Sequence, residues 1–89
     1  MARVIFTANL QRHVACPECT VGGATLHAAL HEVFAQQPQL RDYVLDEQGH
    51  LRRHIFVFVD GRRVRDRERL AEPLAESSEV YVMQALTGG

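Results

Sequence analysis

Residues 52–64 read RRHIFVFVDGRRV, and this stretch carries the clearest structural signal in the chain. A run of β-branched and aromatic residues, typical of a β-strand, leads into Asp60 and Gly61. This dipeptide favours a two-residue hairpin turn, and a second strand of charged and apolar residues follows it. Because side chains alternate across a strand, the first strand has two unlike faces. The stretch therefore predicts a β-hairpin, with Ile55, Val57 and Val59 on one face and Phe56 and Phe58 on the other.

A last strand is predicted from Glu79 to Leu86, where the sequence EVYVMQAL alternates in the same way. Its aliphatic face carries Val80 and Val82, and its other face carries Tyr81 and Met83. Residues 67–79, RERLAEPLAESSE, predict a loop between the hairpin and this strand.

The first half of the chain predicts two strands and a helix. One strand covers Arg3 to Leu10, and a shorter one runs through residues 19–21 and ends at the glycines that follow. Thr25 is a suitable N-cap, and Pro38 ends the helix near Gln37. The apolar stripe of this helix consists of Leu26, Ala29, Leu30 and Val33. Residues 39–51 predict a short turn of helix and a loop that turns at Gly49.

The order strand, strand, helix, strand, strand, strand predicts an α+β fold. The mixed sheet of about five strands must cover one face with its one main helix. The first and last strands are best placed side by side and parallel in the centre of the sheet. This is the β-grasp, or ubiquitin-like, arrangement. We expect a single domain over residues 1–89 with a flexible tail at 86–89.

Size and charge exclude several classes of protein. The 89 residues suffice for one domain, and a net charge of -1 gives no electrostatic reason to expect binding to nucleic acid or a membrane surface. No apolar run approaches the roughly 20 residues of a membrane span, and RVIFTANL is too short for a signal peptide. Two cysteines are too few for a disulfide framework. We expect a cytoplasmic protein.

Residues 40–89 add a resemblance to a known family. The stretch LRDYVLDEQGHLRRHIFVFVDGRRVRDRERLAEPLAESSEVYVMQALTGG resembles the longer branch of the MoaD/ThiS sulfur carriers. Their shared features are a loop ending in Gly, an Arg/His pair, an apolar strand, an Asp/Asn-Gly turn, a Leu-containing loop and a final Gly-Gly. The resemblance implies that an E1-like enzyme uses ATP to adenylate the C-terminal carboxylate. A sulfur donor then makes a thiocarboxylate, which passes its sulfur to an acceptor biosynthetic enzyme.

A terminal Gly88-Gly89 pair suits this chemistry. An α-carboxyl group has a pKa of roughly 3.3–3.7, so it is ionised and unreactive until adenylation supplies a leaving group. Glycine has no Cβ, so such a tail can enter a narrow channel in a partner. The resemblance makes Gly89 the reacting residue of a carrier that binds no cofactor permanently. The chain is then a co-substrate, at most the small subunit of a synthase, and not an enzyme by itself.

Two other functions fit the same residues. A ubiquitin-like modifier would join Gly89 to a lysine of a target protein. A non-covalent β-grasp module would bind partners without using the tail. An independent enzyme is disfavoured, because VGGAT lacks the lysine and the spacing of a nucleotide-binding loop.

The aromatic face of the sheet is the predicted partner-binding surface. One helix can cover only one face, and exposed aromatic, Met and Arg residues are typical of interfaces. This surface comprises Phe56, Phe58, Tyr81 and Met83, with Arg63 and Arg65 nearby.

Cys16, Cys19, His27 and His31 have the side chains of zinc ligands, in the pattern C-x2-C-x7-H-x3-H. The seven residues between the pairs fall short of the roughly 12–15 that are usual in zinc fingers. The cysteines also precede a strand, whereas a thioredoxin-type pair lies at a helix N-terminus. We therefore expect no metal site, but a dithiol in a loop and two exposed histidines on a helix.

Overall fold

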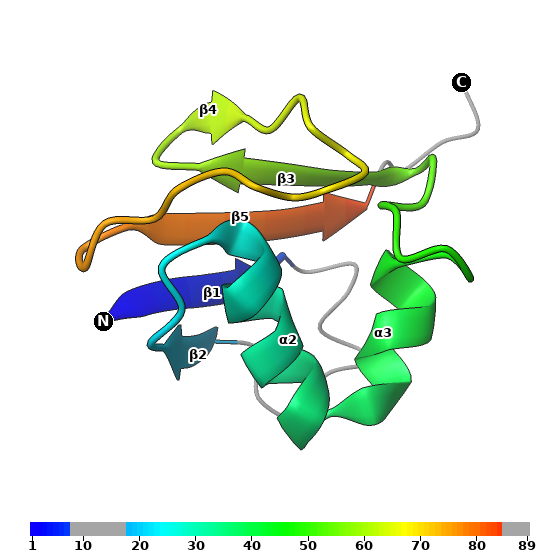
Figure 1. Cartoon of the computed structure of the whole chain (residues 1–89), viewed down its shortest axis with the longest axis horizontal. Coiled ribbons are helices and arrows are strands. Elements are labelled where there is room, and N and C mark those ends of the chain that lie inside the picture. Colours follow the sequence, from blue (N-terminus) through cyan, green and yellow to red (C-terminus); the bar gives the residue numbers. More distant parts are fainter. Residues whose placement is uncertain (8–17, 85–89) are drawn as a thin grey trace.

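A five-stranded mixed sheet with two helices on one side forms the fold (Figure 1). The computed structural model describes residues 1–7 and 18–84. Its strands are β1 (Ala2–Phe6), β2 (Glu18–Val21), β3 (Ile55–Val59), β4 (Arg62–Arg63) and β5 (Glu79–Gln84). Its helices are α2 (Leu26–Gln36) and α3 (Pro38–Val44). The predicted order of elements is confirmed, and the short helical turn expected after Pro38 is a separate seven-residue helix.

The strands lie in the order β2-β1-β5-β3-β4. β1 and β5 are parallel neighbours, with Val4 opposite Val80, and the other neighbouring strands are antiparallel. The predicted central pairing of the first and last strands is thus confirmed. Residues 8–10 of the predicted first strand, and residues 85 and 86 of the last, lie outside the described residues, as does the tail at 86–89.

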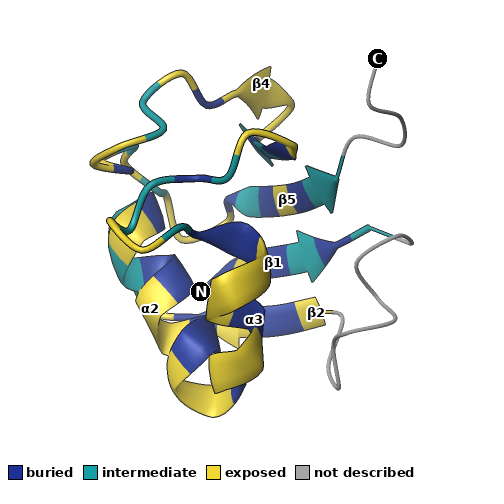
Figure 2. Cartoon of the chain, turned by 90° about the vertical axis from the view of Figure 1, so that its right-hand side faces the viewer, coloured by how far each residue is buried: buried dark blue, intermediate teal, exposed yellow. Residues whose placement is uncertain are grey.

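The inner face of the sheet is aliphatic and packs under α2. The buried residues of β3 are Ile55, Val57 and Val59, and those of β5 are Val80 and Val82, as the alternation predicts. Figure 2 shows buried and less buried positions alternating along β5. The buried cluster unites the apolar stripe of α2 with Val4 and Phe6 of β1, and with Ile55, Val57, Val59, Val80 and Val82. Partly exposed and exposed side chains therefore occupy the opposite, outer face.

The start of α2 is held by a loop that is distant in the sequence. The Thr25 hydroxyl accepts a hydrogen bond from the Ala28 amide at 3.2 Å, which confirms the predicted N-cap. The amides of Leu26 and His27, the first two of the helix, donate to the carbonyls of Glu72 and Leu70 at 2.8 and 2.9 Å. These carbonyls satisfy two donors that a helix leaves without an internal partner.

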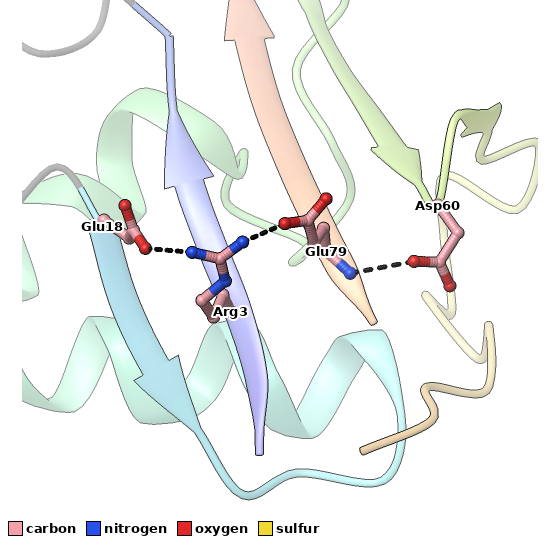
Figure 3. Close-up of polar contacts among 4 residues, drawn as sticks. All are labelled: Arg3, Glu18, Asp60 and Glu79. Atoms are coloured by element: carbon pink, nitrogen blue, oxygen red, sulfur yellow. Dashed lines mark hydrogen bonds and ion pairs between the residues drawn. The ribbon is translucent and has the colours of Figure 1, made fainter. Parts of the chain in front are cut away.

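The β3–β4 turn is clasped to the start of β5. Asp60 and Gly61 have φ of 51° and 82°, as a turn with two left-handed residues requires. The Asp60 carboxylate accepts a hydrogen bond from the Glu79 amide at 2.9 Å (Figure 3). It also accepts one from the Ser78 hydroxyl at 3.0 Å. These donors, the amide foremost, lower the pKa of Asp60. Asp60 therefore fixes the hairpin against the central strand.

Arg3 joins three neighbouring strands on the outer face. Its guanidinium donates to the Glu18 carboxylate at 2.7 Å and to the Glu79 carboxylate (Figure 3). These side chains come from β1, β2 and β5, so this ion-pair chain runs across the end of the sheet.

Candidate functional site

The predicted binding residues lie together on the outer face of β3 and β5. The sheet register places Phe56 opposite Met83 and Phe58 opposite Tyr81, so the four form two cross-strand pairs. We call these four residues the outer patch. Tyr81 is exposed and the other three are half-buried. The sequence thus predicted correctly which side chains share this face.

Ile5 extends the outer patch onto β1. It lies opposite Tyr81 in the parallel pairing and is half-buried. Ile5 is not among the predicted binding residues, although its position between Val4 and Phe6 places it on the outer face by simple alternation. The apolar surface therefore spans three adjacent strands.

Arginine side chains border one side of the outer patch. The Arg63 guanidinium lies 4.6 Å from the centre of the Phe56 ring, and that of Arg67 lies 5.4 Å from it. Both contacts are within the range of cation–π attraction. Arg65 is exposed in the same segment and borders a surface hollow lined by Arg62, Arg63, Val64, Arg65, Asp66, Arg67 and Glu72.

Arg67 was not predicted as a site residue. It is fixed in place because its guanidinium donates to the Ile55 carbonyl at 2.7 Å and also to the Arg52 carbonyl. Burial, and then the nearby Arg63 charge, lowers the pKa of Arg67. No local sequence pattern reveals this position, because the contacts join residues 12 and 15 positions apart.

The arginines near the outer patch take no part in the ion pairs of the described residues. Within residues 1–7 and 18–84, the ion pairs involve Arg3 and Arg62, with Glu18, Glu79 and Glu72. Arg63, Arg65 and Arg67 have no carboxylate within ion-pairing distance in that part of the chain. Two guanidinium groups over one ring repel each other unless an anion approaches. The site can therefore receive an acidic group next to an apolar contact.

The outer patch extends close to the end of β5, the last strand that the structure describes. Gln84, the last residue of β5, lies opposite Ile55, and Met83 precedes it. Gly88 and Gly89 lie outside the described residues, and so does the predicted reacting carboxylate.

The expected loop dithiol is wrong for Cys19. Cys19 lies in β2, where alternation turns its side chain inward, and it is 7% exposed. The side-chain amide nitrogen of Gln37 donates a hydrogen bond to the Cys19 sulfur at 3.7 Å. Cys16 lies outside the described residues. His27 and His31 are exposed on α2, as expected. Among the described residues, no three His, Cys, Asp or Glu side chains gather as metal ligands.

The architecture is that of the β-grasp, ubiquitin-like proteins. The family model of the ThiS family matches residues 12–89, so the chain belongs to the ThiS family, a group of ubiquitin-like sulfur carriers. This confirms the resemblance read from the sequence.

Solved structures share the fold over nearly the whole chain. Small archaeal modifier protein 1 (SAMP1) from Haloferax volcanii is 25% identical, with a TM-score of 0.80 and coverage of 99% of this chain and 98% of that chain. SAMP1 from Methanosarcina acetivorans is 22% identical, with a TM-score of 0.83 and coverage of 99% and 95%. A chain of the BexX/CysO complex from Amycolatopsis orientalis is 21% identical, with a TM-score of 0.84 and full coverage of both chains. A search of curated proteins found no significant match.

No helix within residues 1–7 and 18–84 has both the length and the apolar character needed to cross a membrane.

Proposed function

We propose that this protein is a sulfur carrier whose Gly89 carboxylate is activated and converted to a thiocarboxylate. The observation that carries the proposal is the ThiS-family match, which extends through Gly88 and Gly89. The structure supports it because the tail follows a central strand anchored on both sides by β1 and β3. A rigid base with a short glycine tail is suited to presenting a carboxylate inside another protein.

The chemistry requires one substitution at the α-phosphorus of ATP and then one at the terminal carbonyl carbon. A carboxylate oxygen first attacks the α-phosphorus of ATP, and pyrophosphate leaves to give an acyl adenylate. A sulfur nucleophile such as hydrosulfide then attacks the carbonyl carbon, the C–S bond forms, and AMP leaves as the C–O bond to the adenylate breaks. The product is a thiocarboxylate, with a proton released to solvent. An E1-like enzyme supplies the catalytic groups and ATP site, so this chain is the co-substrate.

The outer patch is the proposed docking surface for that enzyme and for the acceptor enzyme. Tyr81 and its three neighbours offer the apolar contact, while Arg63, Arg65 and Arg67 offer positive charge. A matching partner surface would place a carboxylate near Phe56, at the edge of an apolar area. Docking there holds the protein while the tail reaches into the active site.

An intact-mass experiment tests this function. The protein is incubated with ATP, a sulfide source and a lysate of its own organism, beside a variant lacking Gly89 and a Gly22→Ala control. We expect a mass gain equal to the exchange of one oxygen for sulfur in the full chain and in the control, but not in the truncated variant. An unchanged mass, in a lysate whose activating enzymes are shown to be competent, contradicts the proposal.

A protein modifier is the second candidate, because SAMP1 from Haloferax volcanii is named as a modifier protein. In that function the same adenylate would yield an amide bond between Gly89 and a lysine of another protein. The experiment separates the two, since a modifier forms adducts of higher mass with lysate proteins. Such adducts, without the sulfur-containing species, favour the modifier.

A further inference from the structure

His27 and His31 form a close pair on the exposed side of α2. They are one helical turn apart, and the centres of their rings are 4.4 Å apart with the ring planes inclined at 43°. Both side chains are exposed, whereas the buried stripe of the helix faces the sheet. The pair is thus open to solvent and has no role in the core.

The spacing of the rings fits a two-ligand metal chelate. Metal–nitrogen bonds of about 2.0–2.1 Å, at angles from 90° to tetrahedral, place two coordinating ring centres roughly 4.5–5 Å apart. The observed 4.4 Å is close to this range. Exposed histidine side chains can make the remaining adjustment by small rotations about their own bonds. The helix therefore holds the two rings at a separation close to the one that a shared ion requires.

Cys19 cannot complete this site. Its sulfur contacts Gln37, which caps the opposite end of α2 from His27. At 1.5 Å per residue, Gln37 lies about 15 Å along the axis from His27 and about 9 Å from His31. The described residues supply only these two imidazoles, so an ion held there keeps open positions for water or small ligands.

We propose that His27 and His31 form a chelating site for one late first-row divalent cation, such as Ni²⁺, Cu²⁺ or Zn²⁺. Imidazole is a favoured ligand of these ions, whereas Ca²⁺ and Mg²⁺ prefer oxygen. The second imidazole binds intramolecularly once the first has bound, so its effective concentration is high. The site does not involve Gly89, and it stands or fails independently of the carrier function.

The test is a titration of the full chain with Ni²⁺, followed by calorimetry and by NMR of the imidazole resonances. We expect one site per chain, with paramagnetic broadening of His27 and His31 before His50 and His54. His27→Ala or His31→Ala should weaken binding at least tenfold, since linked binding contributes about 10²–10⁴ in affinity. His54→Ala, a change at another exposed histidine, should leave the affinity unchanged.

A spacing control keeps the number of histidines constant. The double variant His31→Ala/Ala35→His separates the two imidazoles by two turns, about 12 Å along the helix, so it should bind as weakly as the single variants. Ala35 is exposed, so the fold should tolerate the change. Ni²⁺ should also raise the Tm of the unaltered protein and of His54→Ala, but not of the double variant. Equal affinity in the double variant and the unaltered protein would overturn the proposal.

Discussion

Of the two glycines between β2 and α2, Gly23 is expected to tolerate replacement by alanine less well. A Cβ at this position would lie 2.6 Å from the Ala29 nitrogen, 2.8 Å from the Ala28 carbonyl carbon and 2.9 Å from the Ala28 Cβ. Cβ atoms do not approach other heavy atoms this closely. The helix backbone cannot easily withdraw, because the Ala29 amide donates to the Thr25 carbonyl at 2.9 Å.

The neighbouring Gly22 provides the matched control. A Cβ there would meet only the ends of two flexible side chains, Met1 Cε at 3.6 Å and Glu32 Oε2 at 3.9 Å. Gly→Ala stabilises a protein by about 0.4–1 kcal/mol through the unfolded chain, and this gain is common to both variants. The difference between Gly23→Ala and Gly22→Ala therefore isolates the steric clash.

The expected size of the difference follows from overpacking and chain length. Overpacking typically costs about 1–3 kcal/mol. At roughly 2.1 cal/mol/K per residue, the 89 residues have an unfolding entropy of about 0.19 kcal/mol/K. One kcal/mol therefore corresponds to about 5 °C, and Gly23→Ala should melt about 5–15 °C below Gly22→Ala.

Thermal unfolding followed by circular dichroism measures this difference, and urea titration checks it. The urea midpoint should fall for Gly23→Ala while the m value stays unchanged, because the surface exposed on unfolding is the same. Equal melting temperatures for the two variants would show that the close approach of Gly23 to α2 does not constrain the fold.

Three further outcomes are expected. Tyr81→Ala should slow thiocarboxylate formation in a lysate severalfold with a nearly unchanged Tm, whereas Tyr43→Ala, at an exposed tyrosine on α3, should leave the rate unchanged. Equal rates for the two variants, measured by mass spectrometry, would show that the outer patch is not the docking surface. Leu30→Ala should lower the free energy of unfolding by about 2–5 kcal/mol, or the Tm by about 10–25 °C, because Leu30 is 1% exposed. A decrease of under 1 kcal/mol in urea titration would show that the core repacks to fill the cavity. The pKa of Asp60 is lowered in the folded state, first by the Glu79 amide, so its contribution is present above the unfolded pKa of about 3.9 and is lost as pH falls through the folded pKa. Melting curves between pH 7 and pH 3 should therefore show a smaller loss for Asp60→Asn than for the unaltered protein, and parallel losses would contradict this linkage.

Much of the fold was predictable because its signals are local. Alternation along β3 and β5 places Val57 and Val82 on one face of the sheet and Phe56 and Tyr81 on the other. This separation depends only on the strand backbone and not on contacts with distant residues. Thr25 and Pro38 bound α2 for equally local reasons, an accepting hydroxyl at one end and a steric conflict at the other. These features depend on backbone geometry within a few residues.

The apolar part of the candidate site and Arg63 beside it were predictable, whereas Arg67 was not. Strand period alone placed the outer patch on one face. Arg67 lies near Phe56 only because the loop after β4 folds back beside β3. There the Arg67 guanidinium donates hydrogen bonds to two backbone carbonyls. The burial of Cys19 likewise depends on a contact with Gln37, 18 residues away.

By itself the sequence determined the strands, the main helix, the hairpin turn and the two faces of the sheet, because hydrophobic periods and turn residues act over a few bonds. The order and spacing of the features over residues 40–89 also indicated the family that the ThiS match confirmed. Only the tertiary structure decided which carbonyls cap α2, which arginines cover Phe56, and that Cys19 lies away from His27 and His31. Those contacts join distant segments, so they exist only once packing of the apolar core has brought the segments together.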